Sequence, residues 1–270
     1  MSYFTDVIYR YDGTFEGLLC CVFESYEKKE IPTEIIGPDK GQGSLLVIKQ
    51  IQTEPEKVRR VAVAVPTKIS QEAFDFIRYA FLTCFNEKEL TILLFLRKGF
   101  RVGSKVMFML TDDVVDKLTK AVKHLLNESH LLKGFIRFSD FHDVLVAEIA
   151  PKNYVLPLLA KHFSERYPQE RFVIYDKTHQ MALVYDSYQT IIGPIEKMEL
   201  PKVDEREASY RKLWKTFYDT IEIKERHNPK CRMNLMPKRY WRYMTEFNEV
   251  SAEQITKLTE SNQKNYCGNF

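Results

Sequence analysis

GFIRFSDFHDVLVAEIAP, residues 134–151, marks the point at which the pattern of the chain changes. Upstream of it, apolar residues recur every three or four positions, as in helices, whereas here they alternate with polar residues, as in strands. The stretch therefore predicts two strands, at about 135–138 and 144–149, joined by a tight polar turn. A helix is expected at 153–167, followed by strands at 171–175 and 181–185. The order strand, strand, helix, strand, strand predicts an antiparallel sheet of at least four strands with a helix on one face.

The N-terminal half has mostly helical periodicity. Thr14 is placed to cap a helix that runs to about residue 26, after a short strand at 7–11. Residues 31–44 contain two Pro and three Gly and are expected to form a loop, followed by a strand at 45–51. Further helices are predicted at 55–65, 70–85, 87–98 and 112–132. The expected fold is α+β, with a helical region at 1–133, the sheet at 134–190, a basic helical segment at 191–250 and a tail at 251–270, all in one integrated domain.

The positive charge of the chain is concentrated near its C-terminus. The whole 270-residue chain has a formal net charge of only +3. Residues 221–245 contain seven Lys or Arg against two Glu, which gives this segment alone +5. A local excess of this kind points to an acidic partner at one surface more than to a generally basic protein.

Several classes of protein are disfavoured by simple features of the sequence. The N-terminus has no basic region followed by an apolar run, and apolar runs are far shorter than the roughly 20 residues of a membrane span. The five Cys are odd in number and lack C-x-x-C spacing, and no H-E-x-x-H pattern occurs. The sequence thus predicts a cytoplasmic protein without a membrane segment, with no metal site and no cofactor.

Two C-terminal helices carry the clearest binding pattern. In the helix expected at 204–221, the apolar residues Tyr210, Leu213, Trp214, Phe217 and Ile221 share one side and are expected to face the core. In the helix expected at 237–247, Tyr240, Tyr243, Met244 and Phe247 share one side, and Trp241 lies at its border. The cations opposite them suit phosphate backbones, although an ordinary solvated face would have the same pattern. The predicted nucleic-acid-binding residues are Arg226, Asn228, Lys230, Arg232, Lys238, Arg239, Trp241 and Arg242, together with Arg211, Lys212 and Lys215.

A second group of polar residues lies in and around the predicted sheet. His162 and Arg166 are one helical turn apart. A helical wheel with 100° per residue places Arg166 on the apolar side of its helix. Asp176, at the end of RFVIYD, is the expected partner of Arg166 in a pair that fixes the helix to the sheet. The alternative is a site in which His162 and Asp176 bind or transfer a proton, with His130 as a third candidate.

Four blocks resemble an uncharacterised bacterial family associated with DNA repair or DNA metabolism. They are YRYDGTFEGLLCCVFESYEKKEIP (9–32), KGFIRF (133–138), APKNYVLPLLAKHFSERYPQERFVIYD (150–176) and IKERHNPKCRMNLMPKRYWRYMTE (223–246). Family members are encoded beside a radical S-adenosylmethionine protein, and some are fused to a uracil-DNA glycosylase-like domain. The resemblance implies roles for Glu128, His130, Arg137, His162, Arg166 and Asp176, and for residues of the C-terminal block that include Arg226, Asn228, Arg239 and Trp241. The chain departs from the family pattern at Leu131, where a basic residue is expected after the histidine.

The resemblance and the basic segment together predict a DNA-binding accessory protein of DNA repair or modification. The partner implied by the family is a radical S-adenosylmethionine protein, which would hold the iron–sulfur chemistry. Two alternatives remain open. One is a nucleic-acid-processing enzyme that uses His130, His162 and Asp176, and the other is a protein-interaction scaffold without affinity for DNA.

Overall fold

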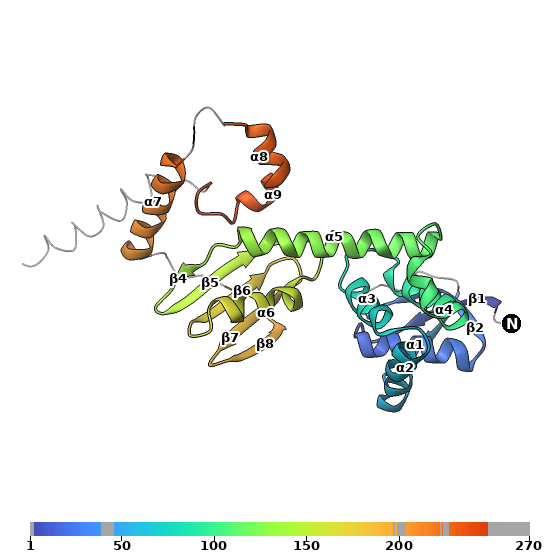
Figure 1. Ribbon diagram of the computed structural model, residues 1–270. Coiled ribbons are helices and arrows are strands. Elements are labelled where there is room, and N and C mark those ends of the chain that lie inside the picture. Colours follow the sequence, from blue (N-terminus) through green and yellow to red (C-terminus); the bar gives the residue numbers. More distant parts are fainter. Residues whose placement is uncertain are drawn as a thin grey trace, which may run out of the picture. The chain divides into compact units, whose positions relative to one another are not determined.

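The computed structural model describes residues 3–38, 46–196, 198, 204–221, 223 and 227–247, and Figure 1 shows their arrangement in helices and strands. The α+β class predicted from the sequence is confirmed. The chain divides into two compact units. Unit 1 comprises Met1–Glu128 and Lys152–Val155, and unit 2 comprises Ser129–Pro151 and Leu156–Phe270. The predicted integration of the chain into one domain stays a prediction.

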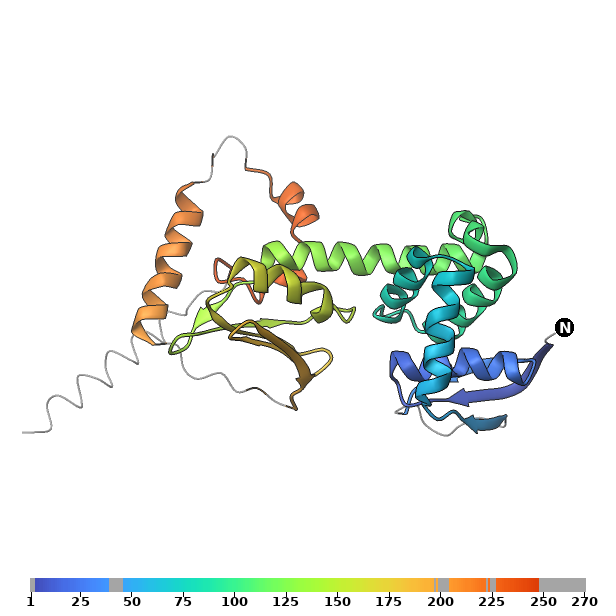
Figure 2. The same ribbon diagram turned by 60° about the horizontal axis from the view of Figure 1, so that its bottom comes forward.

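Unit 1 combines a small parallel sheet with a set of helices. Its strands are β1 (Tyr3–Arg10), β2 (Glu30–Ile36) and β3 (Val47–Gln50), in the order β2-β1-β3 with parallel neighbours. Its helices are α1 (Phe15–Glu27), α2 (Pro55–Lys68), α3 (Gln71–Phe81), α4 (Lys88–Val102), the 3-10 helix η1 (Gly103–Phe108) and the larger part of α5 (Asp113–Phe135). The helices gather on one side of this sheet (Figure 2). They enclose a core of aliphatic and aromatic side chains in which Tyr9, Phe95 and Leu96 are fully buried.

Local signals explain how α1 begins. The Thr14 side chain accepts a hydrogen bond from the Gly17 amide at 2.9 Å, as expected of a helix cap. A Cβ at Gly17 would lie 2.2 Å from Asp12 Oδ1, so no larger residue fits there without displacing this turn. Asp12 in turn accepts hydrogen bonds from the Thr14 amide and from the hydroxyls of Thr14 and Thr53. These contacts fix the turn that joins β1 to α1.

The prediction for the N-terminal half was right about its helices and about the strands expected at 7–11 and 45–51, and wrong at the start of the loop expected between them. Residues 31–44 were expected to form a loop, yet Glu30–Ile36 is strand β2. Pro32 made this stretch look unlike a strand, but β2 lies at the edge of the sheet, where a residue without an N–H is tolerated. Unit 1 therefore combines a three-stranded sheet with helices and is not a purely helical region.

Unit 2 is built on a five-stranded sheet with α6 on one face, as Figures 1 and 2 both show. The strands are β4 (Ser139–Asp140), β5 (Val144–Ile149), β6 (Arg171–Asp176), β7 (Met181–Asp186) and β8 (Gln189–Pro194), paired in that order. The helices are α6 (Leu156–Arg166), α7 (Glu205–Thr220), α8 (Pro229–Leu235) and α9 (Lys238–Trp241), together with the end of α5. The aromatic rings of Phe138, Phe163 of α6, Phe172 and Tyr185 contact one another in that order, with adjacent centroids 4.9–6.4 Å apart.

The predicted antiparallel sheet is wrong at its centre. Strands β5 and β6 pair in parallel, with Val144 opposite Arg171 and Ile149 opposite Asp176. Because α6 carries the chain back across the sheet between them, β6 starts at the same end as β5. The other three pairings are antiparallel. The element order is compatible with either arrangement, and only the path of α6 distinguishes them.

The predicted boundaries of unit 2 also need correction. The strand expected at 135–138 is absent, because Phe135 is the last residue of α5 and β4 covers only Ser139–Asp140. Strand β8 was not predicted, since the last strand of the sheet was expected at 181–185. Ser187 and Tyr188 adopt positive φ angles of 48° and 65°, which are typical of the tight hairpin turn that joins β7 to β8. The helix expected at 237–247 is the single turn α9, followed by further turns.

Candidate nucleic-acid interface

A cavity of about 660 Å³ in unit 2 is lined by residues from the end of α5, from α6 and from α7. The segment between α5 and β4 and the turn that contains Thr245 complete its wall. Four of the residues singled out in the sequence, Arg137, His162, Arg166 and Arg211, meet here. They are separated by up to 74 positions along the chain, from 137 to 211, so only the fold brings them together.

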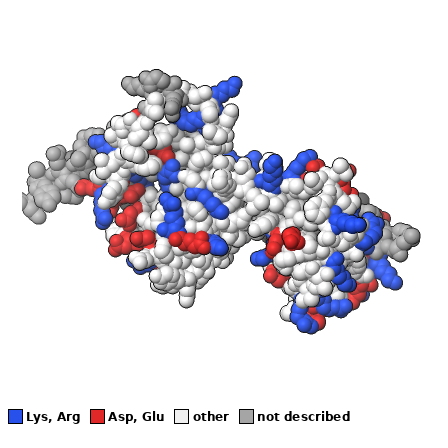
Figure 3. Space-filling view, in the orientation of Figure 1, with Lys and Arg blue, Asp and Glu red and all other residues white. Residues whose placement is uncertain are grey.

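The lining of this cavity is rich in basic side chains. Lys133, Arg137, His162, Arg166 and Arg211 contribute to it, and Glu207 is the one acidic residue in its described lining. Figure 3 shows Lys and Arg side chains gathered on unit 2 in this view, with Asp and Glu side chains to the left of them and below. A concave surface with an excess of one charge concentrates ligands of the opposite charge.

Aromatic side chains form the rest of the wall. Phe138, Phe163, Tyr167, Tyr210 and Trp214 all line the cavity. Phe163 and Tyr167 lie almost parallel, with an interplanar angle of 4°, and Phe138 contacts both of them edge-on. Tyr210 and Trp214 are 54% and 39% exposed and present ring surface to the solvent side. Base rings stack on surfaces of this kind with little sequence preference.

Arg137 anchors the C-terminal segment to this wall. Its Nη2 and Nε donate to Glu246 Oε1 and Oε2 at 2.7 and 3.2 Å, and the Glu246 side chain is only 1% exposed. The Trp214 indole N–H also donates to Glu246, at 3.1 Å, and the Arg137 guanidinium lies 5.6 Å from the Trp214 ring centroid. Burial by itself would raise the pKa of Glu246, but the hydrogen bonds and charge of Arg137 outweigh it and lower the pKa below its ordinary value.

Arg211 has a comparable structural role on α7. Its Nε donates to Glu207 Oε1 at 2.8 Å, and a second guanidinium nitrogen donates to the Ser139 hydroxyl. Glu207 is 7% exposed and also accepts a hydrogen bond from the Asp140 amide at 3.3 Å. These bonds connect α7 to β4, and they neutralise much of the Arg211 charge.

Lys133 and Arg166 are the cations of the cavity that keep an uncompensated charge. Both side chains are exposed, and neither forms an ion pair within the described parts of the chain. Arg166 is oriented by Tyr167, whose hydroxyl accepts a hydrogen bond from Nε at 3.2 Å. Lys133 and Arg166 are therefore the residues best placed to bind an anion.

Both of these cations affect the pKa of His162. Its pKa is lowered, first because the ring is partly buried and then because Lys133 and Arg166 repel a second positive charge. Glu165 acts in the opposite direction. At neutral pH the imidazole is neutral, so it offers the cavity one hydrogen-bond donor and one acceptor without adding charge.

The pKa of His162 gives a direct test of this arrangement. Arg166→Gln removes a nearby positive charge and is expected to raise the pKa of His162, whereas the neighbouring Glu165→Gln removes a negative charge and is expected to lower it. The imidazole proton resonances, followed by NMR through a pH titration, report both shifts. Equal pKa values in the wild type and both variants would show that His162 does not face these charges.

The basic residues of the C-terminal segment are mostly on the surface. Lys230, Lys238, Arg239 and Arg242 are exposed, and Arg232 is half-buried. Lys212 is exposed on α7, whereas Lys215 is half-buried and pairs with Asp219 at 3.2 Å. Asn228 caps α8 by accepting a hydrogen bond from the Cys231 amide, which is a structural role. The predicted binding residue Arg226 lies outside the described residues, as does the predicted tail at 251–270.

Trp241 is less available for base stacking than the sequence suggested. Its ring stacks on Phe247, with centroids 4.4 Å apart and an interplanar angle of 13°. The indole N–H donates to the Met236 carbonyl at 2.9 Å, and Arg232 lies 5.4 Å from the ring centroid. Tyr240 and Met244 are buried, which confirms that this side of the segment anchors it.

The apolar side of α7 was expected to face the core, and this prediction is wrong. Tyr210, Leu213, Phe217 and Ile221 are between 51% and 65% exposed. The periodicity correctly indicated an amphipathic helix, but it does not indicate what covers the apolar side. Only Tyr210 and Trp214 of this set belong to the cavity.

The structure does not bring His130, His162 and Asp176 together in this cavity. His130 is exposed on α5, and neither it nor Asp176 belongs to the described lining. Asp176 is fully buried and accepts a hydrogen bond from His179 Nδ1 at 2.6 Å and from the amides of Thr178 and His179. Its role is to fix the turn between β6 and β7.

The expected pair between Arg166 and Asp176 is also wrong, for a reason set by the topology. Helix α6 runs antiparallel to the parallel strands β5 and β6 that it connects. Its last residue, Arg166, therefore lies toward the start of β6, whereas Asp176 is the last residue of that strand. Arg166 is exposed at the cavity instead of buried against the sheet.

The family resemblance implies a functional role for Glu128, but its contacts in the structure are those of a residue that stabilises the fold. It is 3% exposed, and its carboxylate accepts hydrogen bonds from the amides of Lys152 and Asn153 and from the Asn153 side chain. Asn153 also accepts a hydrogen bond from the Cys84 amide at 3.0 Å. The carboxylate thus holds α5 to the loop that precedes α6, within unit 1.

Sequence reasoning missed Lys133, Glu207, Tyr210 and Glu246 as parts of the site. Lys133 adjoins the change of period at Gly134, and Glu207 lies in the first turn of the helix expected at 204–221. Asp204 does cap α7, since its carboxylate accepts a hydrogen bond from the Glu207 amide at 2.7 Å. No local pattern marks Glu246, because its partners Arg137 and Trp214 lie 109 and 32 positions away in sequence.

Comparison with known proteins places this site within a family. The family of the domain of unknown function DUF4130 matches residues 86–246, which is more than half of the chain. The chain belongs to the DUF4130 family. The matched region contains the whole cavity lining and both members of the Arg137–Glu246 pair.

Other comparisons add little to the DUF4130 assignment. No curated protein matches the chain. A solved structure, that of the pGpG-specific phosphodiesterase PggH from Vibrio cholerae, is similar over 68% of this chain and 81% of its own, with 11% identity and a TM-score of 0.28. A similarity this low supports no argument about fold or activity.

In the part of the chain that the structure describes, no helix has both the length and the apolar character needed to cross a bilayer. Within the same residues, no three His, Cys, Asp or Glu side chains are grouped so that they could hold a metal ion.

Proposed function

We propose that unit 2 binds nucleic acid and that its cavity holds one unstacked nucleotide. The observation that carries this proposal is the combination of five basic or titratable side chains with an aromatic wall around one concave surface. Lys133 and Arg166 would bind the phosphate, and Tyr210 and Trp214 would support the base. Phosphate contacts of this kind supply affinity without reading sequence, whereas stacking favours single-stranded or extruded bases.

The exposed cations of the C-terminal segment extend this surface. Lys230, Lys238, Arg239 and Arg242 would contact neighbouring phosphates and steer the strand toward the cavity. The volume of about 660 Å³ is within the range of small-molecule and cofactor sites and is ample for one nucleotide.

The biological setting comes from the family resemblance. DNA is the expected nucleic acid, and the expected role is that of an accessory protein in DNA repair or modification that acts with a radical S-adenosylmethionine partner. Within this setting the protein presents the strand, and the partner performs the reaction.

A processing activity is the second candidate, and only His162 supports it. The imidazole lies beside the two cations that would bind phosphate, and its lowered pKa keeps it neutral and able to accept a proton at neutral pH. In this reading His162→Gln would keep affinity for DNA but abolish any product formed from a bound oligonucleotide.

Binding to single- and double-stranded DNA across a salt series tests the proposed function. Lys238→Ala, Arg239→Ala and Arg242→Ala together are expected to weaken binding and to make the log–log salt slope shallower by about 2 for single strands, from roughly 0.7 per phosphate contact. A matched control, Arg78→Ala, Lys105→Ala and Lys120→Ala, removes three exposed cations from unit 1.

The two variants separate the possible outcomes. If the wild type and the C-terminal variant have equal affinity and equal salt slopes, the C-terminal segment is not part of the interface. A wild-type protein without measurable affinity at low salt would overturn nucleic-acid binding altogether and favour the protein-interaction scaffold.

A further inference from the structure

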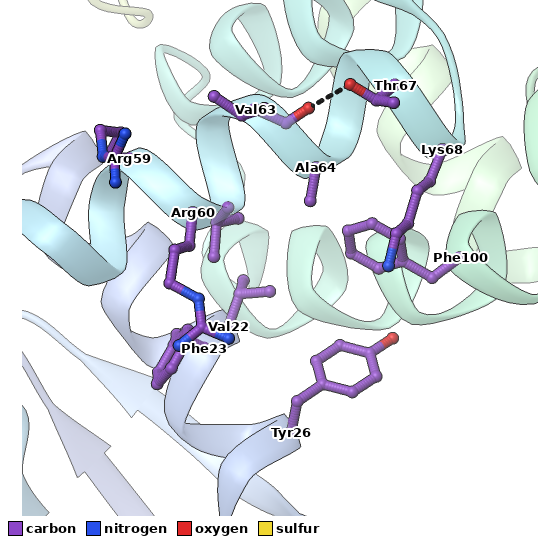
Figure 4. Close-up of a pocket in the computed structure, with 11 residues that line it drawn as sticks. Val22, Phe23, Tyr26, Arg59, Arg60, Val63, Ala64, Thr67, Lys68 and Phe100 are labelled. Atoms are coloured by element: carbon purple, nitrogen blue, oxygen red, sulfur yellow. Dashed lines mark hydrogen bonds between the residues drawn. The ribbon is translucent and has the colours of Figure 1, made fainter.

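A second concave surface lies in unit 1, mostly outside the region that matches DUF4130. This groove has a volume of about 630 Å³ and is formed by α1, α2 and Phe100 of α4 (Figure 4). Its floor is apolar and includes Val22, Ala64 and Phe100. It shares no residue with the cavity of unit 2.

One side of α2 faces the groove along most of its length. Arg60, Val63, Ala64, Thr67 and Lys68 repeat at spacings of three and four, which places them on one side of the helix. Val63 is 61% exposed although it is apolar. The Thr67 hydroxyl donates to the Val63 carbonyl at 2.7 Å, so its polar group is already bonded (Figure 4).

Cations stand at the two ends of this side of α2. Figure 4 shows Arg59 and Arg60 toward one end and Lys68 toward the other. Arg59 is paired with Glu56, whereas Arg60 and Lys68 form no ion pair within the described residues. Eight residues separate Arg60 from Lys68, which corresponds to about 12 Å along a helix axis.

Cations already lie over two aromatic rings of the groove. Arg60 covers one face of Phe23, with its guanidinium carbon 4.8 Å from the ring centroid, and Arg97 covers one face of Tyr26 at 4.5 Å. The Tyr26 ring also meets Phe100 edge-on, at 5.7 Å and 87°. The groove also includes the aliphatic side chains of Val22, Val63 and Ala64, which suit apolar side chains of a partner.

We propose that this groove binds an amphipathic helix of a partner protein that carries acidic residues. Apolar side chains at i, i+3 or i+4, and i+7 would lie on Val63, Ala64 and Phe100, as in other complexes of a helix with a groove. Two acidic residues seven or eight positions apart would pair with Arg60 and Lys68, because that spacing covers the same 12 Å or so. This inference is independent of nucleic-acid binding by unit 2.

A displayed library of amphipathic helices tests both the groove and the charge. The helices are about 15 residues long and alanine-based, with Leu at i, i+3, i+4 and i+7 and with Glu, Gln or Lys at the flanking positions. The full-length protein is the bait. Enrichment of Glu at two positions seven or eight residues apart is expected, and equal enrichment of Glu and Lys, or of no sequence, would overturn the proposal.

Variants then locate the binding site of the selected peptides. Arg60→Gln with Lys68→Gln is expected to weaken binding of a fluorescent selected peptide at least about ten-fold, and Val63→Asp should do the same. Arg78→Gln, an exposed cation of α3 outside the groove, is the control and should leave affinity unchanged. Unchanged affinity in both groove variants, or stronger binding of a single-stranded oligonucleotide that depends on Arg60, would assign the groove a different role.

Discussion

Lys133→Glu together with Arg166→Glu is expected to reduce the affinity for single-stranded DNA by about 100-fold near physiological salt. Each substitution removes a cation that forms no ion pair with the residues the structure describes, and it places an anion where the proposed phosphate lies. Both side chains are exposed, so the fold loses little from the change. Fluorescence anisotropy with a labelled oligonucleotide measures the loss, and circular dichroism confirms that the variant is folded.

A matched control shows whether the effect belongs to the cavity or to overall charge. Lys123→Glu with Lys161→Glu makes the same charge change on α5 and α6, at exposed residues that do not line the cavity. Screening over roughly 8 Å at physiological salt should limit its effect to a few-fold. A similar loss in the control and cavity variants would mean that the cavity is not the binding site.

Arg137→Ala is expected to lower the free energy of unfolding of unit 2 by about 3 kcal/mol, because it leaves a buried carboxylate unpaired. Glu246 is 1% exposed in its side chain and would keep only the Trp214 indole and weaker contacts as partners. Urea denaturation followed by tryptophan fluorescence reports the unfolding of unit 2 specifically. The chain contains two Trp, and both Trp214 and Trp241 lie in unit 2.

A second substitution separates loss of the pair from loss of the buried charge. Arg137→Ala combined with Glu246→Gln removes the unpaired carboxylate, so the double variant is expected to be more stable than Arg137→Ala alone. If both proteins unfold at the same urea concentration, the buried charge is not the source of the instability. If Arg137→Ala is as stable as the wild type, the pair does not hold the C-terminal segment.

The same pair predicts a dependence of stability on pH. Folding lowers the pKa of Glu246, so between its folded and unfolded pKa values the unfolded state binds the extra proton, and stability rises with pH. The contribution is complete above the unfolded value, near 4.3, and is lost as pH falls through the lower folded value. The difference in stability between the wild type and Glu246→Gln should therefore shrink on acidification below about pH 4.3.

Many residues of the candidate site could be identified from the sequence, but their grouping around one cavity could not. Arg137, His162, Arg166 and Arg211 were all identified from the sequence, yet in three different roles. The wheel placed Arg166 in the core because it considers one helix alone, whereas the position of α6 over a parallel strand pair leaves Arg166 exposed. Glu246 could not be identified as a buried partner, because its burial depends on Arg137 and Trp214, which lie far from it in sequence.

Much of the local structure could be predicted from the amino-acid sequence. Hydrophobic periodicity and capping residues placed α1, α3 and the start of α7, because both depend on neighbours within one or two helical turns. It also placed the excess of positive charge near the C-terminus. These features need no information about distant parts of the chain.

The strand directions, the exposure of α7 and the cavity could not be predicted in this way. The parallel pairing of β5 with β6, the exposed apolar side of α7 and the basic cavity between α5, α6 and α7 all depend on which surfaces meet. A periodic pattern states that a surface is apolar or charged, but the contact that covers it is made by residues far away in sequence. The change of period at GFIRFSDFHDVLVAEIAP therefore predicted a sheet. The directions of its strands and the cavity beside it depend on long-range packing.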